Sequence, residues 1–430
     1  MTKALLVGTI SKGQKSNIVE LLKELERLAD TSGIKTIDTI VQKIEKPNPK
    51  FFIGEGKVFE IKKICEKKST DAVIFDNELT ATQQRNLEEH IPSRIIDRTR
   101  LILNIFAQRA RTQEAKLQVE LAEKQYELPR LSDKSTYLAQ QRGVIGIRAG
   151  FGERKLEVDR RKIKDRIAYL KKEIEKIKFH RAIQRSKRQD VPLRIVSIVG
   201  YTNAGKSTFL NYLTGKNSVY ADDKLFATLD PTTRKVKLQN GKLVLFSDTV
   251  GFIKKLPHQL IAAFKSTLEE ITKSDLIIHL IDISYKNYKD NEKTVMDVLK
   301  EIGAEKLTII NAYNKCDLLK LDSHSPMKTF GDKFRGNDIP FHTENNFYLS
   351  AKTGLGVQEL LSAICVKFES ELKYKKISIP YNLFSLISKI KSAGKIIRFK
   401  PQKNDPTGYA ELEILIDEKN WGQIKKFLSV

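Results

Sequence analysis

Residues 200–207, Gly-Tyr-Thr-Asn-Ala-Gly-Lys-Ser, match the pattern GxxxxGK[ST], which is typical of a phosphate-binding loop. The apolar segment Ile195–Val199 reads as a strand before the loop, and TFLNYL reads as a helix after it. In that context the loop N–H groups can surround a β-phosphate at the positive end of a helix. We expect Lys206 to reach the β- and γ-phosphates and the Ser207 hydroxyl to coordinate Mg²⁺.

A second motif, Asn314-Lys315-Cys316-Asp317, matches NKxD and follows the strand-like segment Leu307–Ile310. The Asp317 carboxylate can accept hydrogen bonds from the N1–H and the 2-amino group of guanine. Adenine lacks both donors and would leave the carboxylate unpaired. Asn314 is expected to hold the loop and touch the base edge, and Lys315 to lie over the ring. An isolated NKxD is more often a surface turn, but its place after the phosphate loop and at a strand end favours a guanine site.

A third motif, Ser350-Ala351-Lys352, follows the strand-like segment Phe347–Leu349. The backbone N–H of Ala351 can donate a hydrogen bond to guanine O6. The triplet is weak evidence alone, but its order and spacing after NKCD support a guanine site.

Between the phosphate loop and NKCD lies an acidic residue past a buried strand. Leu243–Phe246 is an apolar run, and Asp248-Thr249-Val250-Gly251 follows it. Asp248 is expected to hold Mg²⁺ through a water, and the Gly251 N–H to contact the γ-phosphate. Both groups would then order a loop that is released after hydrolysis.

The segment 222–238 lies where a second nucleotide-sensitive loop belongs, and it should offer a threonine to Mg²⁺ and the γ-phosphate. The residues leave three candidates, Thr228, Thr232 and Thr233.

Phe252 follows Gly251, at a position where well-known small GTPases carry a glutamine that orients the attacking water. Phenylalanine can neither donate nor accept a hydrogen bond. We therefore predict slow intrinsic hydrolysis, with the water placed by switch backbone or by groups of a partner. The Phe252 ring is expected to point away from the phosphates.

These motifs need a scaffold, and 430 residues are enough for two to four domains. Strand and helix patterns alternate over residues 1–100, polar helices dominate 101–188, and 189–370 reads as a doubly wound α/β domain. Residues 371–430 read as a small α+β domain. The predicted fold is thus a P-loop G domain preceded by an α/β subdomain with an antiparallel helical, coiled-coil arm, and followed by a small tail domain.

The arm prediction rests on a long helix over 154–187 with coiled-coil spacing. Its apolar positions are Leu156, Ile163, Ile167, Leu170, Ile174 and Ile177. We expect two helices packed antiparallel, with a glycine-rich segment at the hinge or tip, although that segment reads equally well as a flexible connector. Its glycines are Gly143, Gly146, Gly150 and Gly152.

The charge balance is strongly positive, with 77 Lys and Arg against 53 Asp and Glu, a net +24. Between Glu153 and Arg188 there are fifteen basic and six acidic residues. Such a helix is either a solvated face or a surface for RNA phosphates, and the overall excess favours a polyanionic partner.

The three cysteines, Cys65, Cys316 and Cys365, are far apart and form no CxxC. They argue against a disulfide framework or zinc site and fit a reducing cytoplasm. The first ten residues read as a strand rather than a signal peptide, and no run of about eighteen apolar residues is present. We expect a cytoplasmic protein, with a peripheral membrane-associated fraction as a further possibility.

Together, the segments GYTNAGKST, LFATLDPTTR, DTVGFI, NKCD and SAK resemble the HflX family of translational GTPases. The more diagnostic segments are DRTRLILNIFAQRARTQEAKLQVELAEKQYELPRL and GFGERKLEVDRRKIKDRI, because other GTPases share the nucleotide motifs. The resemblance covers about residues 1–370. Segment 318–346, rich in Lys, Asp and Gly, departs from it and leaves open how the base-side loops pack.

The resemblance implies binding of the large (50S) ribosomal subunit near the peptidyl-transferase region and, in some bacteria, the splitting of stalled ribosomes under heat stress. Some members are described with ATPase or RNA-unwinding activity. The resemblance also implies that Thr228 is the switch threonine on Mg²⁺, and that a hydrophobic residue at Phe252 is a family feature.

The predicted site has Lys206, Thr228 and Gly251 as catalytic residues, Ser207 and Thr228 as direct Mg²⁺ ligands, and Asp248 as a ligand through water. The residues expected to bind GTP are Gly200, Tyr201, Thr202, Asn203, Ala204, Gly205, Lys206, Ser207, Thr208, Phe226, Ala227, Thr228, Leu229, Asp230, Asp248, Thr249, Val250, Gly251, Asn314, Lys315, Cys316, Asp317, Ser350, Ala351 and Lys352.

The leading hypothesis is a monomeric GTPase that acts on ribosomes. One alternative is a nucleotide-regulated RNA-binding chaperone that needs no hydrolysis. Another is a GTPase on anionic lipid, which is disfavoured because the arm lacks a bulky apolar face and Trp421 is the single tryptophan.

Overall fold

The computed structural model describes residues 2–11, 18–141, 149–188, 193–215, 225–229, 232–255, 265–319, 342–343, 345–380, 383–401 and 409–428. Contacts divide the chain into two units that interleave along the sequence. Unit 1 comprises Met1–Lys178, Ala221–Asp230 and Val250–Leu268, and unit 2 comprises Phe179–Tyr220, Pro231–Thr249 and Glu269–Val430. The predicted domain boundaries therefore stay predictions.

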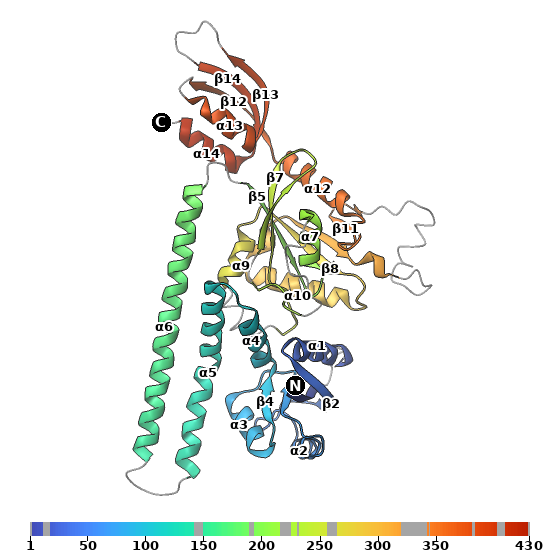
Figure 1. Ribbon diagram of the computed structural model, residues 1–430, viewed down its shortest axis with the longest axis vertical. Helices are drawn as coiled ribbons and strands as arrows, with labels where there is room; N and C mark the ends of the chain where they lie inside the picture. Colours follow the sequence, from blue (N-terminus) through green and yellow to red (C-terminus); the bar gives the residue numbers. More distant parts are fainter. Residues whose placement is uncertain are drawn as a thin grey trace. The chain divides into compact units, whose positions relative to one another are not determined.

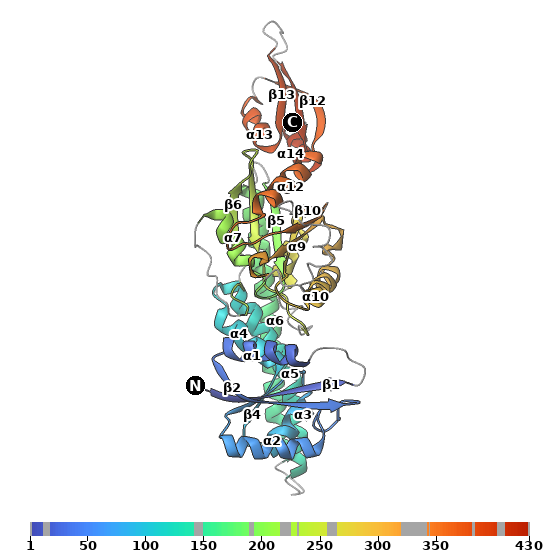
Figure 2. The same cartoon turned by 90° about the vertical axis from the view of Figure 1, so that its right-hand side faces the viewer.

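Unit 1 begins with a four-stranded parallel sheet in the order β2-β1-β3-β4. Its strands are β1 (Thr2–Ser11), β2 (Ile34–Ile44), β3 (Ala72–Phe75) and β4 (Arg94–Asp97), and its helices are α1 (Ile18–Thr31), α2 (Glu55–Lys68) and α3 (Ala81–His90). Figures 1 and 2 show α1 and α2 on opposite faces of this sheet. Cover on both faces explains why the central strand β3 is the uninterrupted apolar run AVIF, which is buried throughout.

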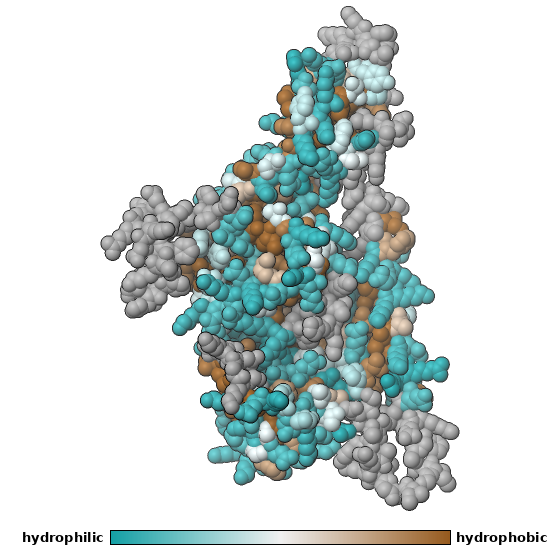
Figure 3. All heavy atoms as spheres, turned by 180° about the vertical axis from the view of Figure 1, so that it is seen from behind, coloured by the Kyte–Doolittle hydropathy of each residue, from teal (hydrophilic) through white to brown (hydrophobic). Residues whose placement is uncertain are grey.

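Three helices follow: α4 (Arg98–Arg109), α5 (Gln113–Gln141) and α6 (Ala149–Arg188), of which α6 passes from unit 1 into unit 2 after Lys178. Helices α5 and α6 run side by side and antiparallel (Figure 1), as predicted. Leu121 of α5 packs with Leu170 and Ile174 of α6, and Leu117 and Ile167 border that cluster. Seen from behind, hydrophobic residues form a narrow strip along this arm (Figure 3).

The glycine-rich segment is placed only in part. Residues 142–148, with Gly143 and Gly146, lie outside the described ranges, whereas Gly150 and Gly152 lie inside α6. The helix thus begins at Ala149, five residues before the predicted start at 154, because the long helix tolerates two glycines in its first turn.

Unit 2 contains a seven-stranded sheet in the order β10-β11-β9-β8-β5-β7-β6. Its strands are β5 (Arg194–Gly200), β6 (Thr232–Lys237), β7 (Leu243–Asp248), β8 (Leu276–Asp282), β9 (Ile309–Asn314), β10 (His342–Thr343) and β11 (Asn346–Tyr348). The five central strands are parallel, and β6 and β10 pair antiparallel at the two edges. The predicted doubly wound fold is confirmed.

The helices around this sheet are α7 (Lys206–Thr214), α9 (Lys265–Thr272), α10 (Tyr288–Glu301) and α12 (Val357–Ser370), with short 3-10 turns η1 (Ala304–Lys306) and η2 (Cys316–Leu318). Figure 2 shows α7 and α10 on opposite faces. Phe209 of α7 and Leu360 of α12 join one core with Val196 and Phe246 of the sheet. Because the strands are parallel, their carboxyl ends meet at one edge, where α/β folds bind ligands.

The last part of unit 2 is a three-stranded antiparallel sheet in the order β12-β14-β13, with β12 (Lys373–Pro380), β13 (Lys395–Pro401) and β14 (Tyr409–Ile416). Two helices, α13 (Ser385–Ala393) and α14 (Glu418–Leu428), cover it. Burial alternates along β14, and Leu412 and Ile414 pack with Ile390 of α13 and Ile424 of α14. This is the predicted α+β module.

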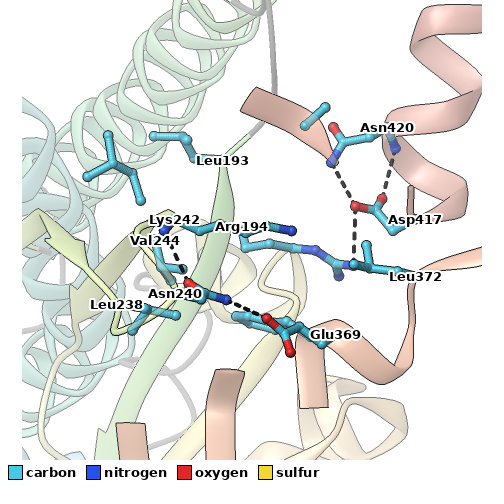
Figure 4. Close-up of a pocket in the computed structure, with 13 residues that line it drawn as sticks. Leu193, Arg194, Leu238, Asn240, Lys242, Val244, Glu369, Leu372, Asp417 and Asn420 are labelled. Carbon is cyan, nitrogen blue, oxygen red and sulfur yellow. Dashed lines mark hydrogen bonds and ion pairs between the residues drawn. The ribbon is translucent and has the colours of Figure 1, made fainter. Parts of the chain in front are cut away.

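A charged junction joins this module to the first residue of β5 (Figure 4). Arg194 pairs with Asp417 at 3.4 Å, as Figure 4 shows. It also pairs with Glu371 at 2.9 Å and with Asp275 at 3.5 Å. Arg194 and Asp417 border a cavity of about 40 Å³, which is far too small for a nucleotide. The junction therefore has a structural role. The nucleotide site must be sought at the other end of β5.

Among the helices in the described ranges, none combines the length and the apolar character needed to cross a membrane.

Candidate nucleotide-binding site

The phosphate loop follows β5 directly and ends at the first residue of α7. Gly205 has a φ of 93°, and a Cβ there would lie 2.4 Å from the side-chain nitrogen of Asn314. A Cβ on Gly200 would lie 2.3 Å from the Leu280 carbonyl oxygen. Close contacts therefore require both glycines of the motif, and the left-handed backbone is a second requirement at Gly205.

Lys206 is folded back over this loop. Its Nζ donates to the carbonyl oxygens of Tyr201 at 2.9 Å and Gly200 at 3.2 Å, and the residue is 7% exposed. The pKa of Lys206 is lowered to about 8, mainly by burial; the negative charge of Asp248 opposes this shift, and the positive charge of Lys315 adds to it. A phosphate group would raise the pKa of Lys206 again, because it supplies a full negative charge next to the ammonium, for which two carbonyl dipoles substitute only in part.

Two oxygen ligands suitable for a hard cation meet beside the loop. The Ser207 hydroxyl, in the first turn of α7, donates to Asp248 Oδ2 at 2.8 Å, and Asp248 is completely buried as the last residue of β7. The next residue is fixed too, since the Thr249 hydroxyl donates to the Ile198 carbonyl oxygen at 2.8 Å. A hydroxyl and a carboxylate at this spacing fit Mg²⁺, which prefers oxygen ligands.

Asn314 ties three loops together on the base side. Its Nδ2 donates to the carbonyl oxygen of Ala204 in the phosphate loop at 2.8 Å. Its Oδ1 accepts from the N–H of Ala351 in the SAK loop, also at 2.8 Å, and the residue is 2% exposed. One side chain thus sets the distance between the phosphate loop and both base-side loops.

The other NKCD side chains have distinct environments. Lys315 Nζ lies 2.7 Å from Asp282 Oδ2, at the carboxyl end of β8. Asp317 lies in η2 and is exposed, so its carboxylate is accessible to a base. The Cys316 N–H donates to the Leu349 carbonyl oxygen at 3.3 Å, and burial raises the pKa of the Cys316 thiol to about 11.

The SAK loop packs closely on α7. Gly354 has a φ of 87°, and a Cβ there would lie 2.2 Å from the hydroxyl oxygen of Tyr212. Ser350 is completely buried, and its carbonyl oxygen accepts from the Gly354 N–H at 2.8 Å. The loop is therefore held in place without a ligand.

Only parts of the predicted switch segments belong to unit 1: residues up to Asp230 in the first and from Val250 onward in the second. The Leu225 N–H donates to the Thr31 hydroxyl at 3.2 Å, and Phe226 meets Phe106 edge-on with ring centroids 4.6 Å apart. Thr228 is half-buried in an irregular segment. These contacts attach the threonine loop to α1 and α4.

A buried charge network attaches the chain after Gly251 to the N-terminal part of unit 1. Arg98 is 2% exposed, and it donates to Asp76 Oδ1 at 2.7 Å and to the Lys254 carbonyl oxygen at 2.9 Å. Arg98 also pairs with Glu24, and Lys255 pairs with Asp76. The backbone a few residues beyond the DTVG motif is therefore held by the N-terminal sheet and its helices.

The structure thus separates the predicted site residues into two groups. The phosphate loop, Asp248, Thr249, NKCD and SAK belong to unit 2, whereas Phe226–Leu229, Val250 and Gly251 belong to unit 1. The roles of Thr228 and Gly251 therefore stay predictions. Asp230 lies outside the described ranges, as do residues 320–341 of the segment after NKCD.

The alternative threonines have other surroundings. Thr232 and Thr233 lie in β6, and the Thr233 hydroxyl donates to the Ser247 hydroxyl at 3.3 Å. Phe252 is 2% exposed, and the direction of its ring relative to the phosphates stays a prediction.

Three residues with defined contacts here were not found from the sequence: Asp282, Arg98 and Asp76. Asp282 and Asp76 each end an apolar strand, LIIHLID and AVIFD, and that signal was available. Nothing in the local pattern distinguishes Arg98 from the arginines around it.

Family models match three consecutive parts of the chain. Residues 19–107 match "GTP-binding GTPase N-terminal", residues 109–188 match "GTP-binding GTPase Middle Region", and residues 195–315 match "50S ribosome-binding GTPase".

Among curated proteins, a GTPase HflX from Caldanaerobacter subterraneus subsp. tengcongensis is 44% identical over 395 residues, covering 92% of this chain and 87% of that protein. The GTPase HflX of Escherichia coli is 40% identical over 362 residues, covering 84% and 82%. Among solved structures, a GTP-binding protein from Sulfolobus solfataricus in complex with GDP is 26% identical, with a TM-score of 0.42, and covers 85% of this chain and 98% of that chain.

Proposed function

This chain belongs to the HflX family of P-loop GTPases, and from that premise we propose that it binds GTP with Mg²⁺, acts on the large (50S) ribosomal subunit, and splits or rescues stalled ribosomes under stress. Asn314 is the observation that carries the nucleotide part. Its two 2.8 Å hydrogen bonds hold the phosphate loop and the SAK loop at one strand end, beside Asp317. That arrangement supports a guanine nucleotide, because Asp317 can accept from two donors that adenine lacks.

The triphosphate would lie along the N–H groups of residues 201–207. Lys206 would exchange the carbonyl oxygens of Gly200 and Tyr201 for β- and γ-phosphate oxygens. Mg²⁺ would be held by Ser207 and Thr228 directly and by Asp248 through water, and it would neutralise charge on the phosphates. The Gly251 N–H would bind the γ-phosphate, so both switch segments would respond to hydrolysis.

Phe252 offers no hydrogen bond to the attacking water, and its ring is buried. We therefore assign water placement to switch backbone or to groups of the ribosome. Intrinsic turnover is then slow and the large subunit stimulates it. The switch segments pack on α1 and α4 of unit 1, which also carries the arm, so ribosome contacts on the arm would act on hydrolysis through them.

The basic arm is the proposed ribosomal RNA surface. On α6, Lys164, Lys171 and Lys172 are exposed and have no ion pair among the described contacts, whereas Arg166 is held by Glu120 through bonds of 2.7 and 2.9 Å. Unpaired lysines release counterions when they meet phosphates, which gives sequence-independent affinity. We further propose a monomeric, cytoplasmic protein.

Co-sedimentation with purified large subunits tests this proposal. Reversing Lys164, Lys171 and Lys172 to glutamate should weaken binding by about tenfold or more at moderate salt. The matched control reverses three exposed lysines of α2, Lys62, Lys63 and Lys67. Equal loss in both variants, or none in the arm variant, would remove the arm from the proposal.

The dependence of ribosome binding on the nucleotide is a second test of the proposal. Binding should be tighter with a non-hydrolysable GTP analogue than with GDP, and large subunits should raise the GTP hydrolysis rate. Binding that ignores the nucleotide would contradict the switch assignment. RNA remodelling that survives Lys206→Ala would instead favour a chaperone that needs no hydrolysis.

A further inference from the structure

Asp282 presents a fully engaged carboxylate next to the guanine-reading loop. It is the last residue of β8 and pairs in register with Asn314, and the Ile283 N–H donates to the Asn314 carbonyl oxygen at 3.1 Å. Its Oδ1 accepts from the Ser284 N–H at 3.0 Å and from the Ser284 hydroxyl at 2.5 Å. These bonds leave Oδ2 aimed at Lys315.

Lys315 is constrained at both ends. Its backbone has a φ of 68°, a left-handed conformation that non-glycine residues adopt only where the surroundings impose it. Its Nζ lies 2.7 Å from Asp282 Oδ2, and both side chains are about one-fifth exposed, at 23% and 22%. The lysine stem therefore has a set direction before any base arrives.

We infer that Asp282 is a positioning residue for guanine recognition, whose carboxylate holds the Lys315 stem where it covers one face of the purine. The inference rests on the proposed GTP site. A free lysine side chain would lose rotamer freedom when a base binds beneath it, and fixing it in advance removes that cost. The pair also keeps the Lys315 ammonium from turning toward the phosphates, where Lys206 already lies.

Asp282→Asn is the direct test, because the amide oxygen can still accept from Ser284 while the charge is lost. The dissociation constants of a fluorescent GDP and of a non-hydrolysable GTP analogue should rise together, by about three- to tenfold. KM should rise while kcat at saturating GTP stays unchanged, because the pair touches the base side only. Asp290→Asn, the same change at an exposed position early in α10, should leave both constants unchanged. An unchanged affinity in Asp282→Asn, or a fall in kcat alone, would overturn the inference.

A double-mutant cycle distinguishes positioning from general damage. Lys315→Met removes the ammonium and keeps an apolar stem, so adding Asp282→Asn to it should change the affinity no further. Additive losses would overturn the inference. The proposed GTP site has its own readout, the preference of the unmodified protein for GTP over ATP. If the unmodified protein showed no preference for GTP over ATP, the proposed GTP site would be refuted. If the preference were retained and the losses of affinity were additive, only the positioning role of Asp282 would be refuted.

Discussion

Replacing Asn314 with alanine tests whether one side chain assembles the nucleotide site. The change removes the donor to the Ala204 carbonyl oxygen and the acceptor for the Ala351 N–H, both at 2.8 Å and both buried. A buried backbone group left without its partner costs about 1–3 kcal/mol. Because water compensates in part for the two lost partners, the free energy that favours the assembled loops should fall by about 2–4 kcal/mol.

That loss should appear as weaker nucleotide binding. Apparent affinity falls with the fraction of molecules whose loops are assembled, so the dissociation constant of a fluorescent GDP should rise about 30- to 1000-fold. Titration by fluorescence anisotropy measures it directly. GTP and GDP should be affected alike, because the bonds hold loops that both nucleotides share.

The matched control is Asn311→Ala, three residues earlier on the same strand. Asn311 Nδ2 donates to Asn346 Oδ1 at 3.0 Å, and neither residue belongs to the nucleotide loops. This variant should bind GDP within about threefold of the unmodified protein. If Asn314→Ala also stays within that range while its fold is intact, the reasoning from the two hydrogen bonds is refuted.

Phe252→Leu keeps most of the buried volume, so basal and ribosome-stimulated hydrolysis should stay within about threefold of the unmodified rates; a loss of both with GTP binding intact would show that the ring takes part. Arg98→Met leaves the buried Asp76 with Lys255 as its remaining cation. The free energy of unfolding, measured by urea denaturation, should fall by about 3–5 kcal/mol. Arg166→Met, which removes an exposed ion pair, should have the same stability as the unmodified protein. Burial lowers the pKa of His279 to about 4, so the folded state stays neutral while the unfolded chain takes up a proton below about pH 6.5. The free energy of unfolding should therefore fall by up to about 3 kcal/mol between pH 6.5 and 4, and His279→Gln should abolish this part of the pH dependence. A His279→Gln variant with the same pH profile as the unmodified protein would contradict the role given to His279.

The nucleotide motifs could be predicted because each is a continuous stretch whose conformation depends on its neighbours. A strand, a glycine loop and a helix in succession predict where Lys206 and Ser207 lie. The coiled-coil spacing of Ile167, Leu170 and Ile174 predicted the arm for the same reason, since three- and four-residue spacing places side chains on one helix face.

The links between motifs could not be predicted in this way. Asn314 and Ala204 are 110 residues apart, and Lys255 and Asp76 are 179 apart. Local spacing carries no information about such pairs, so the NKxD pattern predicted a role for Asn314 on the base but not its bond to the phosphate loop. Asp282 was overlooked because its partner follows it only after another helix and strand.

The sequence alone therefore predicted the chemistry: a phosphate loop, a guanine-selective carboxylate at Asp317, a lysine and a hydroxyl for the triphosphate, and the lack of a water-orienting side chain at Phe252. The tertiary structure alone decided which segments hold one another. It attached the threonine loop and the chain after Gly251 to the N-terminal unit through Thr31 and Arg98. The physical reason is that motif chemistry resides in adjacent side chains, whereas the buried charge network forms only after distant strands and helices have packed and excluded water.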